Sequence, residues 1–331
     1  MPENTTTAPV SAITKSAAPK LSTLNTAHIG LIVVIIIAVI ITSIGTDAFL
    51  TTNNILNVLK QVSVLAVIAA GLTMLMISGG IDFSLGSNLA VTMGIVAQML
   101  TLEVPTLLAI TIGLICATAI GFVNGIVVTY TKVTPFVATL ATATLLDGLA
   151  LVVIDGLSVS AQNKLYEFGN GAILGIPYIL LAAIVICVVV ALVLRYTSFG
   201  RNTFAMGGNE EVARLTGIPV ARNKILLYSM GGMLAGIAGV MLLARLGAAS
   251  PGIGGLSLEL QAVAAVVIGG TSLVGGKGSI LGSVLGVLLL GIVANALNLL
   301  GVSSYFQAMS VGAVLLIAAI LNVVQWRRRK V

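Results

Sequence analysis

Few side chains in this sequence are placed to do chemistry. The 331 residues include one histidine, two cysteines and ten acidic residues. Among the acidic residues, Asp147 lies well inside an apolar run, in the segment ATATLLDGLALVV. Ionisable side chains inside membrane spans are rare and commonly mark an ion or substrate path. Asp147 is therefore a candidate for such a path, although a carboxylate toward the end of a span can equally reach the polar interface.

A second candidate is the Gly-rich stretch SGGIDFSLGS, which contains Gly80, Asp82 and Ser84. A break of this kind can expose backbone and a carboxylate to a water-filled path, whereas the alternative is that Asp82 and Ser84 cap the helix that follows. Asn124 and Asn295 are polar residues within apolar runs, where they could line a route for a hydroxylated solute or form hydrogen bonds between helices. The predicted translocation path comprises Gly80, Asp82, Ser84, Asn124, Asp147 and Asn295.

No catalytic constellation is found in the sequence. The GGK tripeptide at 275–277 fails the phosphate-loop pattern, because that pattern needs Gly at 271 and Ser or Thr at 278, where the chain has Thr271 and Gly278. We find no nucleophile–base pair and no His/Cys/carboxylate cluster with metal-ligand spacing. We therefore expect no catalytic residue, no metal and no cofactor bound by this chain, and no ATPase site of its own.

The polar segment RYTSFGRNTFAMGGNEEVARLTGIPVARNK (195–224) stands out from its apolar surroundings. It holds five of the 16 basic residues of the chain, and it encodes a short helix. Asn209 is a good N-cap, and Glu210 and Glu211 favour the positive end of a helix dipole. Gly217 can end the helix in the left-handed conformation.

The predicted short helix also carries an apolar edge. Val212 and Leu215 are three residues apart and share a face, with Arg214 beside them. Pro219 prevents the helix from resuming. A capped, two-turn helix outside the bilayer, with an apolar edge, predicts a contact with a soluble partner protein.

The composition indicates a polytopic membrane protein of the all-α class. Mean hydropathy is +1.15 and 8% of residues are charged, against roughly a quarter in soluble domains. Residues 1–28 are rich in Thr, Ala, Ser and Pro and predict a disordered tail. We expect a single transmembrane domain over 29–326 and a basic tail at 327–331. The run 29–45 is interpreted as a retained first helix and not as a signal peptide, because it lacks an A-x-A cleavage site.

Ten spans are predicted from runs of about 20 apolar residues. Their ranges are 29–45, 54–77, 86–101, 105–130, 135–153, 174–195, 224–245, 258–271, 279–300 and 305–325. The eighth is short and is either re-entrant or broken by Gly269 and Gly270. The pairs Gly121/Gly125, Gly232/Gly236 and Gly282/Gly286 have the G-x-x-x-G spacing that lets helices approach closely.

The distribution of basic residues sets the orientation. With the N-terminus inside, all but three of the 16 lysines and arginines fall on the cytoplasmic side; the exceptions are Lys60, Lys164 and Arg245. The acidic residues expected outside are Asp47, Glu103, Asp155, Glu167 and Glu259. The C-terminal WRRRK is expected beside anionic membrane lipid, and both termini are expected in the cytoplasm. The basic residues on the cytoplasmic side account for the net charge of +6, so a nucleic-acid partner is not needed to explain it.

Five segments together resemble a known family. They are GGIDFSLGS (79–87), PFVATLATATLLDGLA (135–150), FGRNTFAMGGNEEVARLTGI (199–218), ELQAVAAVVIGGTSLVGGKGSILG (259–282) and NALNLLGVSSYFQ (295–307). They look like the permease subunit of ribose-type ABC sugar importers, and the similarity covers nearly the whole chain after the N-terminal tail. One departure concerns the fifth span, where relatives commonly carry Arg at the position of Asp147.

The resemblance implies a function and partners. The function would be inward transport of ribose or a related sugar across the bacterial plasma (inner) membrane by a permease homodimer. A separate cytoplasmic ATPase would use ATP–Mg, and an extracytoplasmic binding protein would deliver the sugar. The segment 207–218 would be the coupling helix that sits in a cleft of the ATPase. Its predicted contact residues are Gly208, Asn209, Glu210, Glu211, Val212, Arg214, Leu215 and Gly217.

Two other classes remain open at this point. An ion-coupled secondary transporter would need intramembrane acids or Asn/Ser clusters at broken helices to bind the driving ion. An enzyme embedded in the membrane would need a catalytic constellation.

Overall fold

The computed structural model describes residues 26–303 apart from 132, together with 306, 309, 312, 313 and 316. Within those residues the chain forms twelve helices and four two-residue strands. The longer helices are α1 (Thr26–Gly45), α2 (Thr52–Ile77), α3 (Leu85–Thr101), α4 (Thr106–Tyr130), α5 (Pro135–Val153), α7 (Tyr178–Tyr196), α8 (Ser198–Gly208), α10 (Val220–Leu246), α11 (Gly255–Ile268) and α12 (Ile280–Leu299). The short elements are β1 (Val159–Ser160), α6 (Tyr166–Asn170), β2 (Ala172–Ile173), β3 (Ile176–Pro177), α9 (Glu210–Leu215) and β4 (Ala248–Ala249).

Seven of the described helices are long and apolar enough to cross a membrane: α1, α2, α4, α5, α7, α10 and α12. Two further predicted spans are present as the shorter apolar helices α3 and α11. The tenth predicted span, 305–325, lies outside the continuously described residues, as do most of the predicted N-terminal tail and the whole C-terminal tail.

Several helices begin at residues that cap them. The Thr51 hydroxyl accepts a hydrogen bond from Asn54 N at the start of α2, and the Ser279 hydroxyl accepts one from Gly282 N at the start of α12. Pro135 occupies the first turn of α5.

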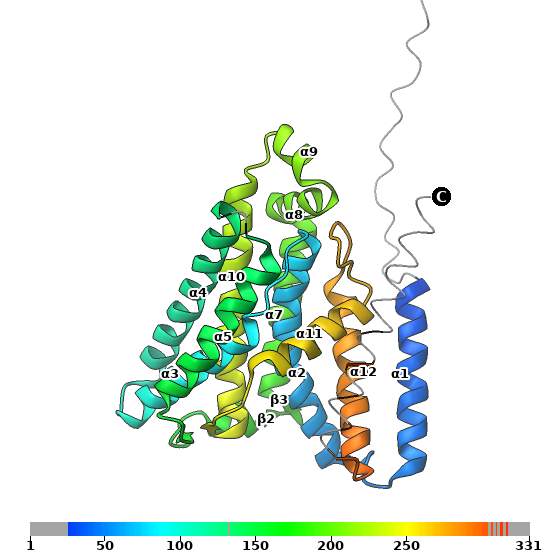
Figure 1. The fold of residues 1–331 in the computed structure, drawn as a ribbon. Helices are drawn as coiled ribbons and strands as arrows, with labels where there is room; N and C mark the ends of the chain where they lie inside the picture. Colours follow the sequence, from blue (N-terminus) through cyan, green and yellow to red (C-terminus); the bar gives the residue numbers. More distant parts are fainter. Residues whose placement is uncertain are drawn as a thin grey trace, which may run out of the picture.

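Helix α2 is the centre of the bundle (Figure 1). Every residue from Val62 to Ile77 is buried. The helix contacts α7, α10, α11 and α12, so it has neighbours on all sides. Helix α1, the more apolar of the two, lies at the edge of the bundle, as expected where the surroundings are lipid, whereas the buried half of α2 contains small residues such as Ala69, Ala70 and Gly71 that permit close helix contact.

Glycines bring α10 and α4 into close contact. A side chain at Gly121 would overlap the carbonyl oxygen of Tyr228, and one at Gly232 would overlap the carbonyl oxygen of Ala117. Gly286 of α12 approaches the carbonyl of Ala265 in α11 in the same way. The helix-packing interpretation of the G-x-x-x-G pairs is confirmed.

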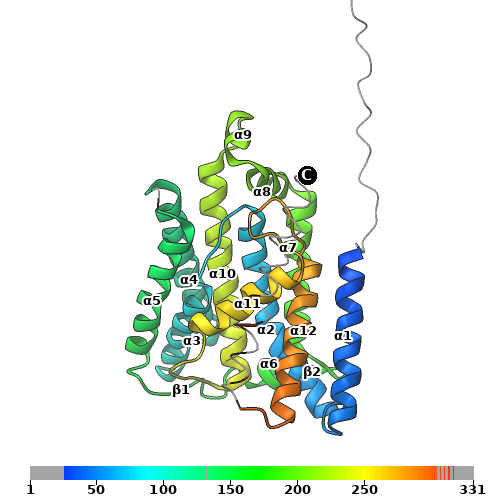
Figure 2. The same ribbon diagram turned by 45° about the vertical axis from the view of Figure 1, so that its right-hand side comes forward.

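The two ends of the bundle differ (Figures 1 and 2). One end carries α8, α9 and the start of α1, whereas α12 finishes at the opposite end. That opposite end is covered by the segment between α5 and α7 and by two small antiparallel pairs. β1 pairs with β4 in the register Val159↔Ala249, and β2 pairs with β3 as a hairpin.

Candidate functional site

A break in the backbone separates α2 from α3. Helix α2 ends at Ile77, and Gly79 adopts the left-handed conformation with φ +83°. The chain then runs back into the bundle before α3 begins at Leu85 (Figure 1). The Tyr228 hydroxyl of α10 donates to the Ile81 carbonyl at 3.1 Å and links this break to α10, and α3 beyond it is one of the two shorter apolar helices.

A chain of buried hydrogen bonds joins the break to α4 and α5. Asp82 Oδ1 accepts from the backbone N–H of Ser84 at 2.8 Å and from its hydroxyl at 2.6 Å. Asn124 Nδ2 donates to the Ser84 hydroxyl at 2.7 Å, and the Thr142 hydroxyl donates to Asn124 Oδ1 at 2.8 Å. Asp82, Ser84 and Asn124 are all buried. The structure therefore brings three of the predicted path residues together in one network.

Glu259 lies in the same region. It was predicted on the outer side of the membrane, at the start of the span 258–271, and its side chain is buried in α11, with 2% of its surface exposed. Glu259 Oε1 accepts from the backbone N–H groups of Gly86 at 3.0 Å and Ser87 at 3.3 Å, the first turn of α3. A carboxylate from another helix thus caps α3, and Asp82 instead forms a local turn with Ser84.

Several polar atoms around this network are buried and have spare hydrogen-bonding capacity. In the part of the chain that the structure describes, no hydrogen-bond partner reaches Asp82 Oδ2, Glu259 Oε2, the Ser87 hydroxyl or Asn88 Oδ1. Buried polar groups are nearly always paired, so each unpaired one needs an explanation. Carboxylate oxygens accept and hydroxyls both donate and accept, which suits a solute rich in hydroxyl groups or a cation.

The other three predicted path residues form no side-chain hydrogen bond with this network. Gly80 is next to the Tyr228 hydroxyl, at the start of the break. Asp147 is exposed and lines a separate cavity of about 320 Å³ between α3, α5 and the loop before α11. Asn295 exchanges two hydrogen bonds with Asn54, of 2.9 and 2.8 Å, which tie α12 to α2.

The polar segment 195–224 folds into α8, α9 and the start of α10. Asn209 Oδ1 accepts from Val212 N at 3.0 Å, and Gly217 adopts φ +85°, so the predicted cap and the predicted end of the short helix are confirmed. Its apolar edge is open: Val212 is 53% exposed and Leu215 is 82% exposed.

Glu210 fastens α9 to the membrane domain. Its carboxylate pairs with Lys224 of α10 at 2.7 Å and with Arg214 at 3.2 Å. Partial burial acts to raise the pKa of Glu210, but the hydrogen bonds and charges of Lys224 and Arg214 outweigh it, so its pKa lies below the usual value. Glu210 therefore stays ionised, and able to pair with Lys224 and Arg214, throughout the neutral range.

The α8–α9 segment is packed against the break. A side chain at Gly207 would overlap the carbonyl oxygen of Ile77, the last residue of α2. Gly276, in the loop between α11 and α12, donates its N–H to the same carbonyl at 2.8 Å. Helix α9 follows α8 directly, so a displacement of α9 would be passed through α8 to the end of α2.

Comparison with known proteins identifies the family. Residues 54–319 match the family described as the permease component of branched-chain amino acid transport systems. The chain belongs to this permease family. The chain is 45% identical to the ribose import permease protein of Bacillus subtilis, covering 86% of this chain and 89% of that protein. It is 41% identical to the ribose import permease protein of Escherichia coli K12, over 88% of this chain and 92% of that protein.

More distant relatives have other sugars in their names. The D-allose transport system permease protein of Escherichia coli K12 is 35% identical over 87% of this chain and 88% of its own length. The L-arabinose ABC transporter permease protein of Azospirillum brasilense is 34% identical over 91% of this chain and 88% of its own length. No solved structure matches the chain. This permease is a multi-pass protein of the inner membrane.

Several residues of the network at the α2–α3 break were not predicted from the sequence. Glu259 begins an apolar run, and a carboxylate at the edge of a span is hard to distinguish from one in an outer loop. Tyr228 and Thr142 lie in apolar helices, where nothing in the spacing marks their partners. Each contact joins residues distant in sequence, such as Tyr228 with Ile81, so local patterns carry no signal for it.

Proposed function

We propose that this permease carries ribose or a related monosaccharide inward across the bacterial inner membrane, driven by a separate ATPase. The observation that supports this most is the 45% identity, over most of both chains, with a protein named as a ribose import permease. The allose and arabinose relatives favour a wider class of monosaccharides. Asp147, a charge reversal in the fifth span, argues against assigning ribose itself without measurement.

In this proposal the sugar passes the network at the α2–α3 break. The unpaired carboxylate oxygens of Asp82 and Glu259 can accept hydrogen bonds from sugar hydroxyl groups, and the Ser87 hydroxyl can donate or accept. Irregular backbone inside a membrane is tolerated where it lines a water-filled cavity, so a sugar path would explain the break. Asp147 lines the cavity at the end opposite α9, where it would meet the solute or its binding protein before the network does.

Helix α9 transmits the force of ATP hydrolysis. Its exposed apolar edge, and the packing of the preceding helix α8 against the end of α2, support a contact with a cytoplasmic ATPase, which binds ATP–Mg itself. An extracytoplasmic sugar-binding protein would dock at the end that carries the β pairs. We further propose that the permease acts as a homodimer, binds no cofactor or metal, has no ATPase site of its own and contacts only lipid and protein.

The proposed topology has ten spans with both termini in the cytoplasm. The start of α1 lies at the α9 end and α12 finishes at the other end, so one further span after α12 would bring the chain back (Figure 1). The apolar run 305–325 supplies it, and α3 and α11 would span together with the irregular segments next to them.

A transport assay tests the energy source. The permease is reconstituted in proteoliposomes with its ATPase and binding protein, and uptake of radiolabelled ribose is measured with ATP enclosed on the ATPase side. We expect uptake to stop when ATP is omitted and to continue when the membrane potential is collapsed by an ionophore.

The opposite result would indicate an ion-coupled secondary transporter, a class for which the buried carboxylates Asp82 and Glu259 would suit the driving ion. Competition by unlabelled allose and arabinose in the same vesicles defines the range of sugars. If none of the three sugars is taken up, the monosaccharide assignment is wrong.

A further inference from the structure

An apolar groove runs along the outside of the α4–α10 contact. A cavity of about 510 Å³ is lined by one stripe of α4, which includes Thr118 and Phe122, and by Ser229 and Met233 of α10. Phe122 also lines a second, larger cavity of about 830 Å³ that extends to α9. Because Phe122 lines both, the two cavities lie next to each other along the α4–α10 contact, and together they extend from the middle of the bundle to its α9 end.

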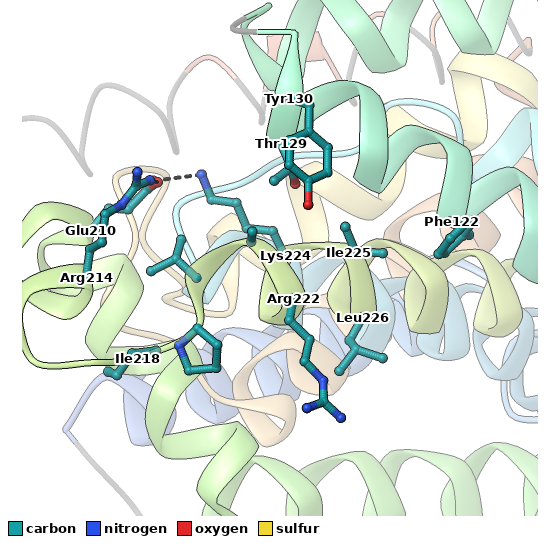
Figure 3. Close-up of a pocket in the computed structure, with 13 residues that line it drawn as sticks. Phe122, Thr129, Tyr130, Glu210, Arg214, Ile218, Arg222, Lys224, Ile225 and Leu226 are labelled. Carbon is teal, nitrogen blue, oxygen red and sulfur yellow. Dashed lines mark hydrogen bonds and ion pairs between the residues drawn. The ribbon is translucent and has the colours of Figure 1, made fainter.

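The groove follows one face of α10. Arg222, Leu226, Ser229 and Met233 are spaced by four, three and four residues, which places them in line on a helix. Figure 3 shows Arg222 and Leu226 pointing the same way, and Lys224 pointing toward Glu210 on another face. From Arg222 to Met233 the helix rises about 16 Å, which is close to the thickness of one hydrocarbon leaflet.

Arg222, at the α9 end of this groove, has no ion-pair partner among the described residues. Glu210 already pairs with Arg214 and Lys224, whereas the exposed Arg222 forms no ion pair with any residue of the described chain. The Thr129 hydroxyl also lines the larger cavity, but it lies on the other side of α10 from the Arg222 guanidinium (Figure 3). An arginine without an ion-pair partner at the head of an apolar groove matches the phosphate of an anionic lipid with an attached acyl chain.

We propose that this groove binds one anionic phospholipid from the leaflet at the α9 end. Its phosphate lies against Arg222, and one acyl chain lies along Phe122, Ser229 and Met233. A lipid seated there contacts α4, α10 and the base of α9 together. It would therefore stabilise the attachment of the proposed coupling helix to the membrane domain.

The test compares retained lipids by native mass spectrometry. The full-length protein is equilibrated with equal amounts of phosphatidylglycerol and phosphatidylcholine carrying identical acyl chains, then stripped by detergent exchange. We expect the wild type to retain phosphatidylglycerol about fivefold over phosphatidylcholine, and Arg222→Gln to abolish this preference, as for the loss of one interfacial cation. Arg222→Lys should keep most of it.

Two variants separate this site from general surface charge. Arg201→Gln removes another exposed cytoplasmic-end arginine, in α8 and outside the groove, and should leave the preference unchanged. Ser229→Phe fills the groove without changing charge and should reduce retention of phosphatidylglycerol. Circular dichroism and size-exclusion chromatography confirm that each variant is folded.

Three results would overturn the proposal. An equal loss in Arg201→Gln would mean a diffuse effect of surface charge. Displacement of the retained lipid by millimolar inorganic phosphate would mean a site for a soluble anion. Unchanged lipid retention in Ser229→Phe, with a loss of dimer in the same spectra, would mean that a second copy of the chain covers the groove.

Discussion

At the scale of single residues, Glu259 is the most consequential side chain that the structure adds. It satisfies two N–H groups of the first turn of α3, which begins inside the bundle where water is scarce. An unpaired backbone donor in such a place costs about 1–3 kcal/mol. The space is also tight, because a side chain at Gly86 would come within 2.6 Å of the carbonyl oxygen of Gly255.

Replacing Glu259 tests this capping role. Glu259→Ala should lower the free energy of unfolding by about 1–3 kcal/mol, because two amides lose their acceptor. Glu259→Gln keeps an acceptor oxygen and should cost clearly less. Thermal unfolding of the purified protein in detergent measures both, with exposed Glu103→Ala as the control that should change nothing. Equal destabilisation by Gln and Ala would assign the effect to the charge and not to the hydrogen bonds.

At the scale of elements, the proposed functional contacts involve the short helix α9 and the break between α2 and α3, whereas the long helices form most of the packing contacts. The long helices α4 and α10 meet through glycines, whose missing side chains permit backbone contact. The short helix α9 is held by Glu210 and Lys224 on one side and leaves an apolar edge free on the other. Its tether and its free edge can therefore be tested separately.

The free edge is tested by Val212→Ser with Leu215→Ser. In the reconstituted transporter we expect ribose uptake to fall at least about tenfold while the protein inserts normally, because burial of two apolar side chains in a partner is worth over 1.4 kcal/mol. ATPase activity and uptake are measured in the same vesicles. Leu102→Ser alters an equally exposed leucine in the α3–α4 turn and serves as the matched control. Normal uptake in the double variant would exclude α9 as the coupling contact.

At the scale of the whole molecule, orientation decides which end meets which partner. Most of the basic residues that the structure describes lie at the end that carries α8 and α9, and that end is predicted to be cytoplasmic. They are Arg195, Arg201, Arg214, Arg222, Lys224 and Lys277. The β2–β3 hairpin lies at the other end, and its tip residue Leu174 is 97% exposed. The native Cys187 is buried and Cys116 is half-buried, so introduced cysteines can be labelled over a low background.

Cysteine labelling tests this orientation. In intact spheroplasts, a membrane-impermeant maleimide should label Leu174→Cys, while Leu215→Cys should react only after the membrane is permeabilised. Both sites are exposed in the folded chain, so access through the membrane is the difference between them. The reverse pattern would invert the topology and remove the basis for placing an ATPase at α9.

The sequence by itself determined the positions of the nine apolar helices that the structure describes, and of the short helix α9. A segment in lipid must satisfy its backbone hydrogen bonds internally, so an apolar run predicts a helix without knowledge of its neighbours. The predicted range 135–153 coincides with α5, and Asn209 and Gly217 bound α9 because caps act within one turn. These features depend on residues near one another in the chain.

Only the tertiary structure decided which residues form the site. Glu259 meets Gly86 across 173 positions and Tyr228 meets Ile81 across 147, so no periodicity or spacing links them. The same packing gathered Asp82, Ser84 and Asn124 into one network and separated Asp147 and Asn295 from it. Hydrogen bonds between distant segments form only where helix packing places their partners. The sequence could therefore identify candidate polar residues, whereas only the fold shows which of them are joined by hydrogen bonds.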